Sequence, residues 1–200
     1  MYNIVTIERR YASGGNEIGK KLADALGYKL YDRNILIKAA KNLEIPYFQI
    51  ENLDESTSGG ILMNLAKTGL GGLSGNRELP LADKLFLEEE RIIEEAAEKG
   101  NCVIVGRASG YILREHKNAL RVFVYADKQK RIQRAIEREG IQQAEAENAL
   151  KRNDKRRSGF YNSVTNWEWG APEYYDLFLN AGNLGIDTCV RILAEALSEG

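Results

Sequence analysis

Short apolar runs alternate with amphipathic helical stretches along almost all of this 200-residue chain. The run at 102–105 is apolar throughout, which is typical of a parallel strand buried on both faces. Strands that alternate with helices favour right-handed crossovers and a mostly parallel sheet with helices on both faces. The sequence therefore predicts a three-layer α/β fold with strands at 4–7, 29–31, 102–105, 120–125 and 176–180.

The predicted helices carry apolar side chains three or four residues apart, which lines one face of each helix. The first of them starts after Gly15 and ends at Gly27, a residue that commonly stops helices. The others are predicted at 35–43, 81–99, 128–139, 142–157 and 186–197.

Composition excludes several classes of function. The formal net charge is −1, so the chain has no overall attraction for a nucleic acid polymer or an anionic membrane. No apolar run approaches the length of a membrane span, and a strand that starts at residue 3 or 4 leaves no room for a signal peptide. Cys102 and Cys189 lie far apart, which favours a reducing compartment. We expect one cytoplasmic domain over residues 1–200.

One segment departs from the regular alternation. Residues 54–80 are rich in glycine and are interrupted by the apolar patch ILMNL at 61–65. A flexible functional excursion and an ordinary surface loop both fit this composition. The patch around Met63 is compatible with a homodimer contact, with a wall of an acceptor site or with a loose loop.

The turn after the first strand is the candidate phosphate site, because ligands of such sheets bind at the carboxyl ends of strands. The standard phosphate loop reads GxxxxGK[ST]. Here Gly14 matches the second glycine, while Arg9 replaces the first glycine, Gly15 replaces the lysine and Asn16 stands near the Ser/Thr. Arg9 and its neighbour Arg10 could supply the missing positive charge. The alternative is a turn that only connects a strand to a helix.

Several runs resemble the cytidylate kinase-like family, in the branch whose loop reads SGG in place of SGK. The opening run is IERRYASGGNEIGKKLA at residues 7–23. CVIVGRA at 102–108, LRVFVYA at 120–126 and YDLFLN at 175–180 follow in the family's order and cover nearly the whole chain. Val105 and Ala108 stand where that family commonly has acids.

The resemblance implies a P-loop kinase-like fold with a five-stranded sheet, an acceptor-binding insertion at about 33–80 and a helical lid at about 140–172. It also implies ATP and Mg²⁺, and phosphoryl transfer to a nucleoside monophosphate such as CMP or dCMP. A nucleotide-binding regulatory module without kinase activity, or a kinase for a different metabolite, remain alternatives. The implied partner is a small nucleotide, and neither a nucleic acid polymer nor a membrane.

The resemblance also assigns residues. Arg107 would hold the acceptor together with Asp32 and Arg33, and would serve in catalysis with basic residues of the lid. Glu8 would approach Mg²⁺ through water. For Asp32 a helix cap is the rival interpretation, and for the lid a solvated charged helix. Trp167 and Trp169 fit packing better than base stacking. The donor phosphates would be wrapped by Arg9, Ala12, Ser13, Gly14, Gly15, Asn16 and Glu17, and the basic lid residues are Arg152, Arg156 and Arg157.

Overall fold

The computed structural model describes residues 2–46 and 79–198. Within them a five-stranded sheet has the order β2-β3-β1-β4-β5, and all four strand pairings are parallel. This confirms the predicted fold class. The strands are β1 (Ile4–Arg9), β2 (Lys29–Tyr31), β3 (Cys102–Val105), β4 (Ala119–Tyr125) and β5 (Leu177–Asn180).

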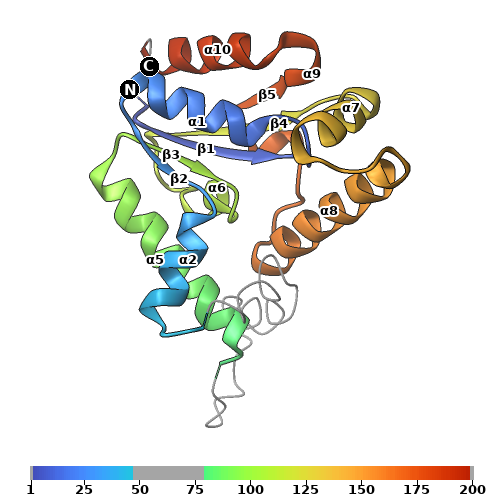
Figure 1. The fold of residues 1–200 in the computed structure, drawn as a ribbon. Coiled ribbons are helices and arrows are strands. Elements are labelled where there is room, and N and C mark those ends of the chain that lie inside the picture. The colour runs from blue at the N-terminus through green and yellow to red at the C-terminus, as the bar shows by residue number, and fades with distance from the viewer. Residues whose placement is uncertain (1, 47–78, 199–200) are drawn as a thin grey trace.

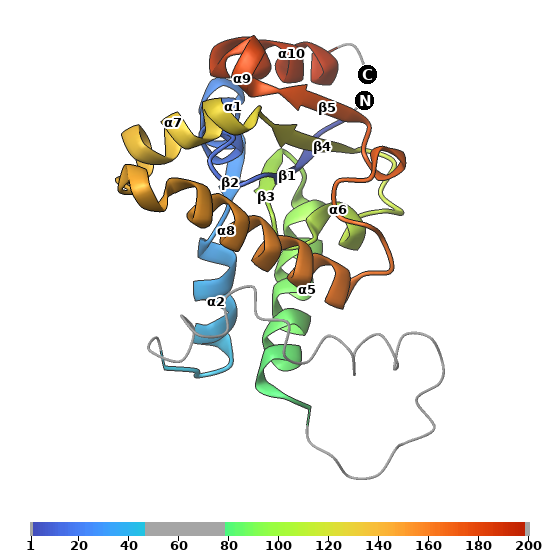
Figure 2. The same ribbon diagram turned by 90° about the vertical axis from the view of Figure 1, so that its right-hand side faces the viewer.

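The helices cover both faces of the sheet, as Figure 1 and its turned view in Figure 2 show. On one face α1 and α10 pack against the strands, and on the other lie α2, α5, α6 and α8. Their bounds are α1 (Gly15–Leu26), α2 (Asn34–Asn42), α5 (Leu81–Lys99), α6 (Ser109–Ile112), α7 (Lys128–Glu139), α8 (Gln143–Val164), α9 (Ala181–Leu184), α10 (Ile186–Ser198) and the 3₁₀ turn η1 (Pro172–Tyr174).

Strand β1 lies at the centre of the sheet, and its alternating side chains divide the core into two halves. Val5 and Ile7 face α1 and α10, whereas Ile4 faces the cluster that contains α5, α6 and α8. All three side chains are fully buried. Because helices cover both faces of the strand, every apolar residue in it contributes to a core.

Two predicted boundaries differ from the structure by more than one residue. Helix α8 continues to Val164, seven residues beyond the predicted end, because Phe160, Tyr161 and Val164 pack into the core. Strand β1 also extends past its predicted end, to Arg9, in register with Val124 of β4. The β1 extension consists of the charged Glu8 and Arg9, and the α8 extension begins with Ser158 and Gly159, so neither continues an apolar period.

The predicted acceptor-binding insertion at about 33–80 lies largely outside the described residues, as does most of the glycine-rich segment at 54–80. Its described flanks are α2 and α5, which pack side by side. Among the helices of the described residues, none is both long and apolar enough to cross a membrane.

Candidate functional site

The loop between β1 and α1 lies at the carboxyl edge of the sheet and curls around a small hollow. Gly14 has φ of 93° and Ala12 has φ of 55°, so both adopt the left-handed conformation that a tight turn requires. The amides of Gly15, Asn16 and Glu17 start α1, and first-turn amides have no acceptor within their own helix. Such a set of amides, at the positive end of a helix, favours an anion.

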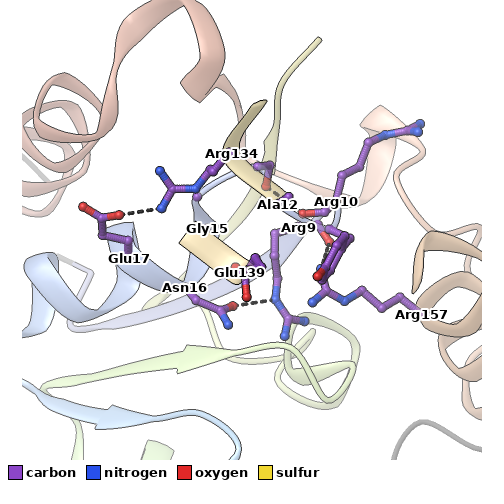
Figure 3. Close-up of a pocket in the computed structure, with 12 residues that line it drawn as sticks. Arg9, Arg10, Ala12, Gly15, Asn16, Glu17, Arg134, Glu139 and Arg157 are labelled. Atoms are coloured by element: carbon purple, nitrogen blue, oxygen red, sulfur yellow. Dashed lines mark hydrogen bonds and ion pairs between the residues drawn. The ribbon is translucent and has the colours of Figure 1, made fainter. Parts of the chain in front are cut away.

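The hollow has a volume of about 80 Å³, which is two to three water molecules' share of liquid volume. Four arginines and two glutamates contribute to its lining, so positive charge predominates. Figure 3 shows these side chains around the loop. The lining residues are Arg9, Arg10, Tyr11, Ala12, Ser13, Gly14, Gly15, Asn16, Glu17, Arg134, Glu139 and Arg157.

Two sets of hydrogen bonds hold the loop in this shape. The Ser13 hydroxyl bonds to the carbonyl oxygens of Arg10 at 2.8 Å and Val124 at 3.1 Å, which ties the loop to β4. On the other side, the Asp154 carboxylate of α8 accepts the Tyr11 amide at 2.8 Å. The sequence-derived site contained Ser13 and left out Asp154.

Arg131 of α7 completes the second set. Its guanidinium donates to the Tyr11 carbonyl oxygen at 2.9 Å and to Asp154 at 2.7 Å, and the residue is 5% exposed. We call Arg131 and Asp154 together the loop clamp. An acid inside the basic stretch of α8 was the one sequence signal that pointed to it.

Glu17 acts through its side chain in a different way from the one predicted. Its carboxylate pairs with Arg134 of α7 and lies 3.6 Å from Lys21, as the dashed line to Arg134 in Figure 3 indicates. The hydrogen bond from Arg134 holds the pKa of Glu17 below its ordinary value. The carboxylate therefore joins α1 to α7, and the contact of Glu17 with the donor phosphates stays a prediction.

Arg9 runs across the loop directly beside Gly15 (Figure 3). Its Nε donates to Asn16 Oδ1 at 3.0 Å, and its side chain is 12% exposed. The Arg157 guanidinium approaches from α8, where it donates to the Arg9 carbonyl oxygen at 3.2 Å and lies 5.6 Å from the Tyr11 ring. Two of the predicted cations thus meet at the hollow.

The other two lid arginines lie on the solvent side of α8. Arg152 and Arg156 are exposed, one turn apart. Burial raises the pKa of Tyr11, and the charges of Arg157, Arg152 and Arg156 oppose that shift. The three predicted lid cations therefore share one electrostatic neighbourhood at the phosphate loop.

Arg107 lies at the end of β3 with φ of 61°, and its side chain points toward α5. The guanidinium is 3.3 Å from the carboxylate of Glu89, which is 1% exposed, and 5.9 Å from the Phe160 ring. Arg107 is itself only 8% exposed. It does not line the phosphate hollow, and its role at an acceptor stays a prediction.

The predicted acceptor residues at the end of β2 serve the local backbone. Asp32 accepts the amide of Asn34 at 3.1 Å, which is the helix-entry role that rivalled acceptor binding. Arg33 precedes the first residue of α2 and is exposed. Acceptor contacts for this pair also stay a prediction.

The two tryptophans pack, as the structural interpretation expected. Trp167 stacks on Tyr174 with ring centroids 4.5 Å apart, and Trp169 meets the edge of Phe123 at 5.4 Å. Trp169 also directs its indole N–H toward Glu8 at 3.5 Å.

Glu8 fits the predicted magnesium role poorly. It is 5% exposed and lies 3.9 Å from the Arg9 guanidinium, which competes with a metal ion for the carboxylate. The side-chain oxygen of Asn16 already accepts from Arg9. The described residues contain no group of three or more His, Cys, Asp or Glu side chains suited to a metal. Because the residues present do not fit a protein-held Mg²⁺ ion, no chemical step is derived through it.

A second hollow of about 190 Å³ adjoins the first and was not predicted. It shares Ala12, Ser13 and Arg134 with the phosphate hollow and extends to the segment after β5. Because chain segments far apart in the sequence form it, no local motif marks it. Its other lining residues are Ala126, Lys130, Gln133, Glu137, Arg138, Ala181, Gly182, Gly185 and Ile186.

The geometry agrees with the class of protein that the comparisons define. The model of the cytidylate kinase-like family matches residues 4–183, and the chain belongs to that family. A cytidylate kinase of Archaeoglobus fulgidus is 32% identical over 60% of this chain and 64% of its own length. A uronate isomerase of Corynebacterium glutamicum is 24% identical over 66% of this chain and 26% of its own. The chain thus spans less than two thirds of either curated relative.

Solved structures support the same fold. An uncharacterized protein from Eubacterium ventriosum superposes with a TM-score of 0.74 at 25% identity, over 98% of this chain and 99% of that one. A shikimate kinase from Bacteroides thetaiotaomicron gives 0.53 at 16% identity, with 98% of each chain covered. These likenesses identify a P-loop kinase fold.

Proposed function

We propose that this protein transfers the γ-phosphoryl group of ATP to a nucleoside monophosphate of the CMP or dCMP type. The observation that carries the proposal is a pair of neighbouring hollows at the carboxyl edge of the sheet. The hollow of the phosphate loop, lined by arginines, shares the lining residues Ala12, Ser13 and Arg134 with the second hollow. This layout suits a donor with a polyphosphate at one end and a nucleoside at the other.

The distribution of charge in ATP indicates which hollow would bind the phosphates and which the nucleoside. Phosphate oxygens suit the first hollow, where the loop amides converge with Arg9 and Arg157. The second hollow has backbone segments containing Gly182 and Gly185 on one side and α7 on the other, which suits a flat, neutral base and its sugar.

In the proposed reaction an oxygen of the acceptor's phosphate attacks the γ-phosphorus of ATP in line. The bond from that phosphorus to the β-γ bridging oxygen breaks, and ADP leaves with the electron pair. Such a transfer depends chiefly on positioning and on cations around the phosphoryl group. Arg9 would act from the loop, and Arg152, Arg156 and Arg157 from the lid. Magnesium would arrive with ATP, held by phosphate oxygens and water.

The acceptor would bind at the ends of β2 and β3, near Asp32, Arg33 and Arg107. The similarity to the cytidylate kinase of Archaeoglobus fulgidus supports a cytidine nucleotide as acceptor. Val105 and Ala108, in place of acids, favour a recognition of the base that differs from that of cytidylate kinases.

A regulatory module that binds nucleotide without transferring phosphate is the second candidate. It is favoured by the absent loop lysine and by Val105, which stands where the family commonly has an acid. Coupled ADP-release assays with each nucleoside monophosphate, and with shikimate and gluconate as non-nucleotide acceptors, separate the candidates. Acceptor-dependent release with CMP or dCMP supports the proposal. Release only with another acceptor shows a different kinase, and ATP binding without release shows the module.

A further inference from the structure

Arg9 and Gly15 compete for one space in the phosphate loop. A Cβ atom at Gly15 would lie 2.6 Å from Arg9 Cβ and 2.9 Å from Arg9 Cγ, with Val124 Cβ a further 3.4 Å neighbour. Contacts under 3.0 Å essentially never occur between real side chains and a Cβ atom. While Arg9 keeps this position, residue 15 has to be glycine. In the standard phosphate loop, the lysine occupies the position of Gly15.

The charged end of Arg9 is bonded to Asn16, lies 3.9 Å from the Glu8 carboxylate and packs against Gly106. Asn16 accepts from its Nε at 3.0 Å and so orients the guanidinium. At Gly106 a Cβ atom would lie 2.4 Å from Arg9 Nη1, and the φ of 77° there favours glycine as well. The guanidinium therefore rests between the start of α1 and the end of β3.

We propose that Arg9 is the phosphate-binding cation of this loop and takes over the work of the missing lysine. The inference rests on the proposed function to the extent that the hollow binds phosphate. In this loop the cation comes from the end of β1 instead of the start of α1. Gly15, Asn16 and Gly106 are then the residues that make room for Arg9 or bind it. A guanidinium is permanently charged and its paired N–H groups match phosphate oxygens, so the loop keeps its charge and gains a fixed geometry.

Binding of inorganic tripolyphosphate to the full chain, measured by calorimetry, tests Arg9 without requiring turnover. Arg9→Met keeps a stem in the space beside Gly15 and removes the charge. We expect its affinity for tripolyphosphate to fall about 10- to 100-fold, the usual weight of a charge-assisted contact. Arg191→Ala, an exposed arginine of α10, is the matched control and should bind as the wild type does.

A reciprocal exchange tests the shared space. Gly15→Lys alone should lose tripolyphosphate binding, because the lysine stem collides with Arg9. The double variant Arg9→Gly with Gly15→Lys should bind at least about tenfold more tightly than Arg9→Gly alone, since the standard cation then has room. This comparison also decides the question if Arg9→Met fails to fold. Wild-type affinity in the Gly15→Lys variant, or no gain in the double variant, would overturn the shared-space argument.

The two proposals fail in different ways. Tripolyphosphate binding that depends on Arg9, with no ADP release from any acceptor, keeps the role of Arg9 and removes the kinase. Acceptor-dependent ADP release with unchanged tripolyphosphate binding by Arg9→Met keeps the kinase and overturns the role of Arg9. Absence of tripolyphosphate binding in the wild type overturns the role of Arg9, whereas the kinase is decided by the ADP-release assay alone.

Discussion

The two ends of the proposed site differ in how sequence relates to geometry. On the donor side the loop lacks the lysine, yet Arg9 and Arg157 meet at a hollow whose backbone is fixed by hydrogen bonds. On the acceptor side the expected arginine is present, yet Arg107 is paired with the buried Glu89. The comparison teaches that a loop with a changed motif can keep its cations and its fixed backbone. A residue that matches the motif can instead form an ion pair inside the fold.

Arg107→Ala sharpens this comparison most, because it separates stability from binding. It would remove the guanidinium that lies 3.3 Å from the Glu89 carboxylate, which is 1% exposed. Breaking one side of a buried pair costs about 3–5 kcal/mol, so urea unfolding should show a loss of that order. The double change with Glu89→Gln should recover part of it. A loss of CMP binding with unchanged unfolding would instead make Arg107 a dedicated ligand residue.

Asp154→Ala tests the loop clamp on the donor side. The change removes the acceptor of the Tyr11 amide and the partner of Arg131, which is 5% exposed. We expect the free energy of unfolding to fall by about 2–3 kcal/mol and tripolyphosphate affinity to fall with it. Asp24→Ala, at an exposed position of α1, is the control. Retained affinity after loss of stability would show that the loop holds its shape without the clamp.

Gly14→Ala tests the preorganised turn itself. The new Cβ would meet Ile186 Cδ1 at 2.5 Å at a residue whose φ is 93°. Strain of this kind costs about 1–3 kcal/mol, and ATP binding should weaken because the turn must shift. Gly27→Ala is the matched control, since φ there is 66° and no atom lies within 4 Å of the new Cβ. Thermal unfolding and ATP titration of the two variants should therefore differ; equal effects would mean that strain alone matters.

Glu17→Gln has the smallest expected effect on stability, and this effect appears only at acidic pH. Arg134 lowers the folded-state pKa of Glu17 below its ordinary 4.5. The ionised Glu17 therefore stabilises the folded state fully above pH 4.5, and this stabilisation is lost as pH falls through the lowered pKa. The variant should therefore lose less stability than the wild type between about pH 5 and pH 3. Urea midpoints across this range measure the difference. Parallel curves for the two proteins would contradict the assignment.

The sequence predicted the layered fold because its strands and helices are strongly periodic. The apolar run at 102–105 became a fully buried β3, and the helix expected at 81–99 is α5. The end of α8 was missed because Ser158 and Gly159, residues of low helix propensity, interrupt the pattern before Phe160 packs into the core. Local periodicity carries no signal for such burial.

The site was predictable only where neighbouring residues in the sequence form it. The loop from Arg9 to Gly15 follows a strand and could be located directly. The loop clamp, the second hollow and the pairing of Arg107 with Glu89 join segments far apart along the chain. Their formation depends on how α5, α7 and α8 pack, and a sequence pattern does not encode that packing locally.

The loop clamp has a consequence for motion. Arg131 and Asp154 belong to the helices on either side of the turn that ends α7, and both hold the backbone of Tyr11. Any swing of this helical pair away from the sheet would remove a donor and an acceptor from the loop at the same moment. Release of a bound polyphosphate and relaxation of the loop that holds it would then occur together, and the rate of the helix movement would limit the rate of release.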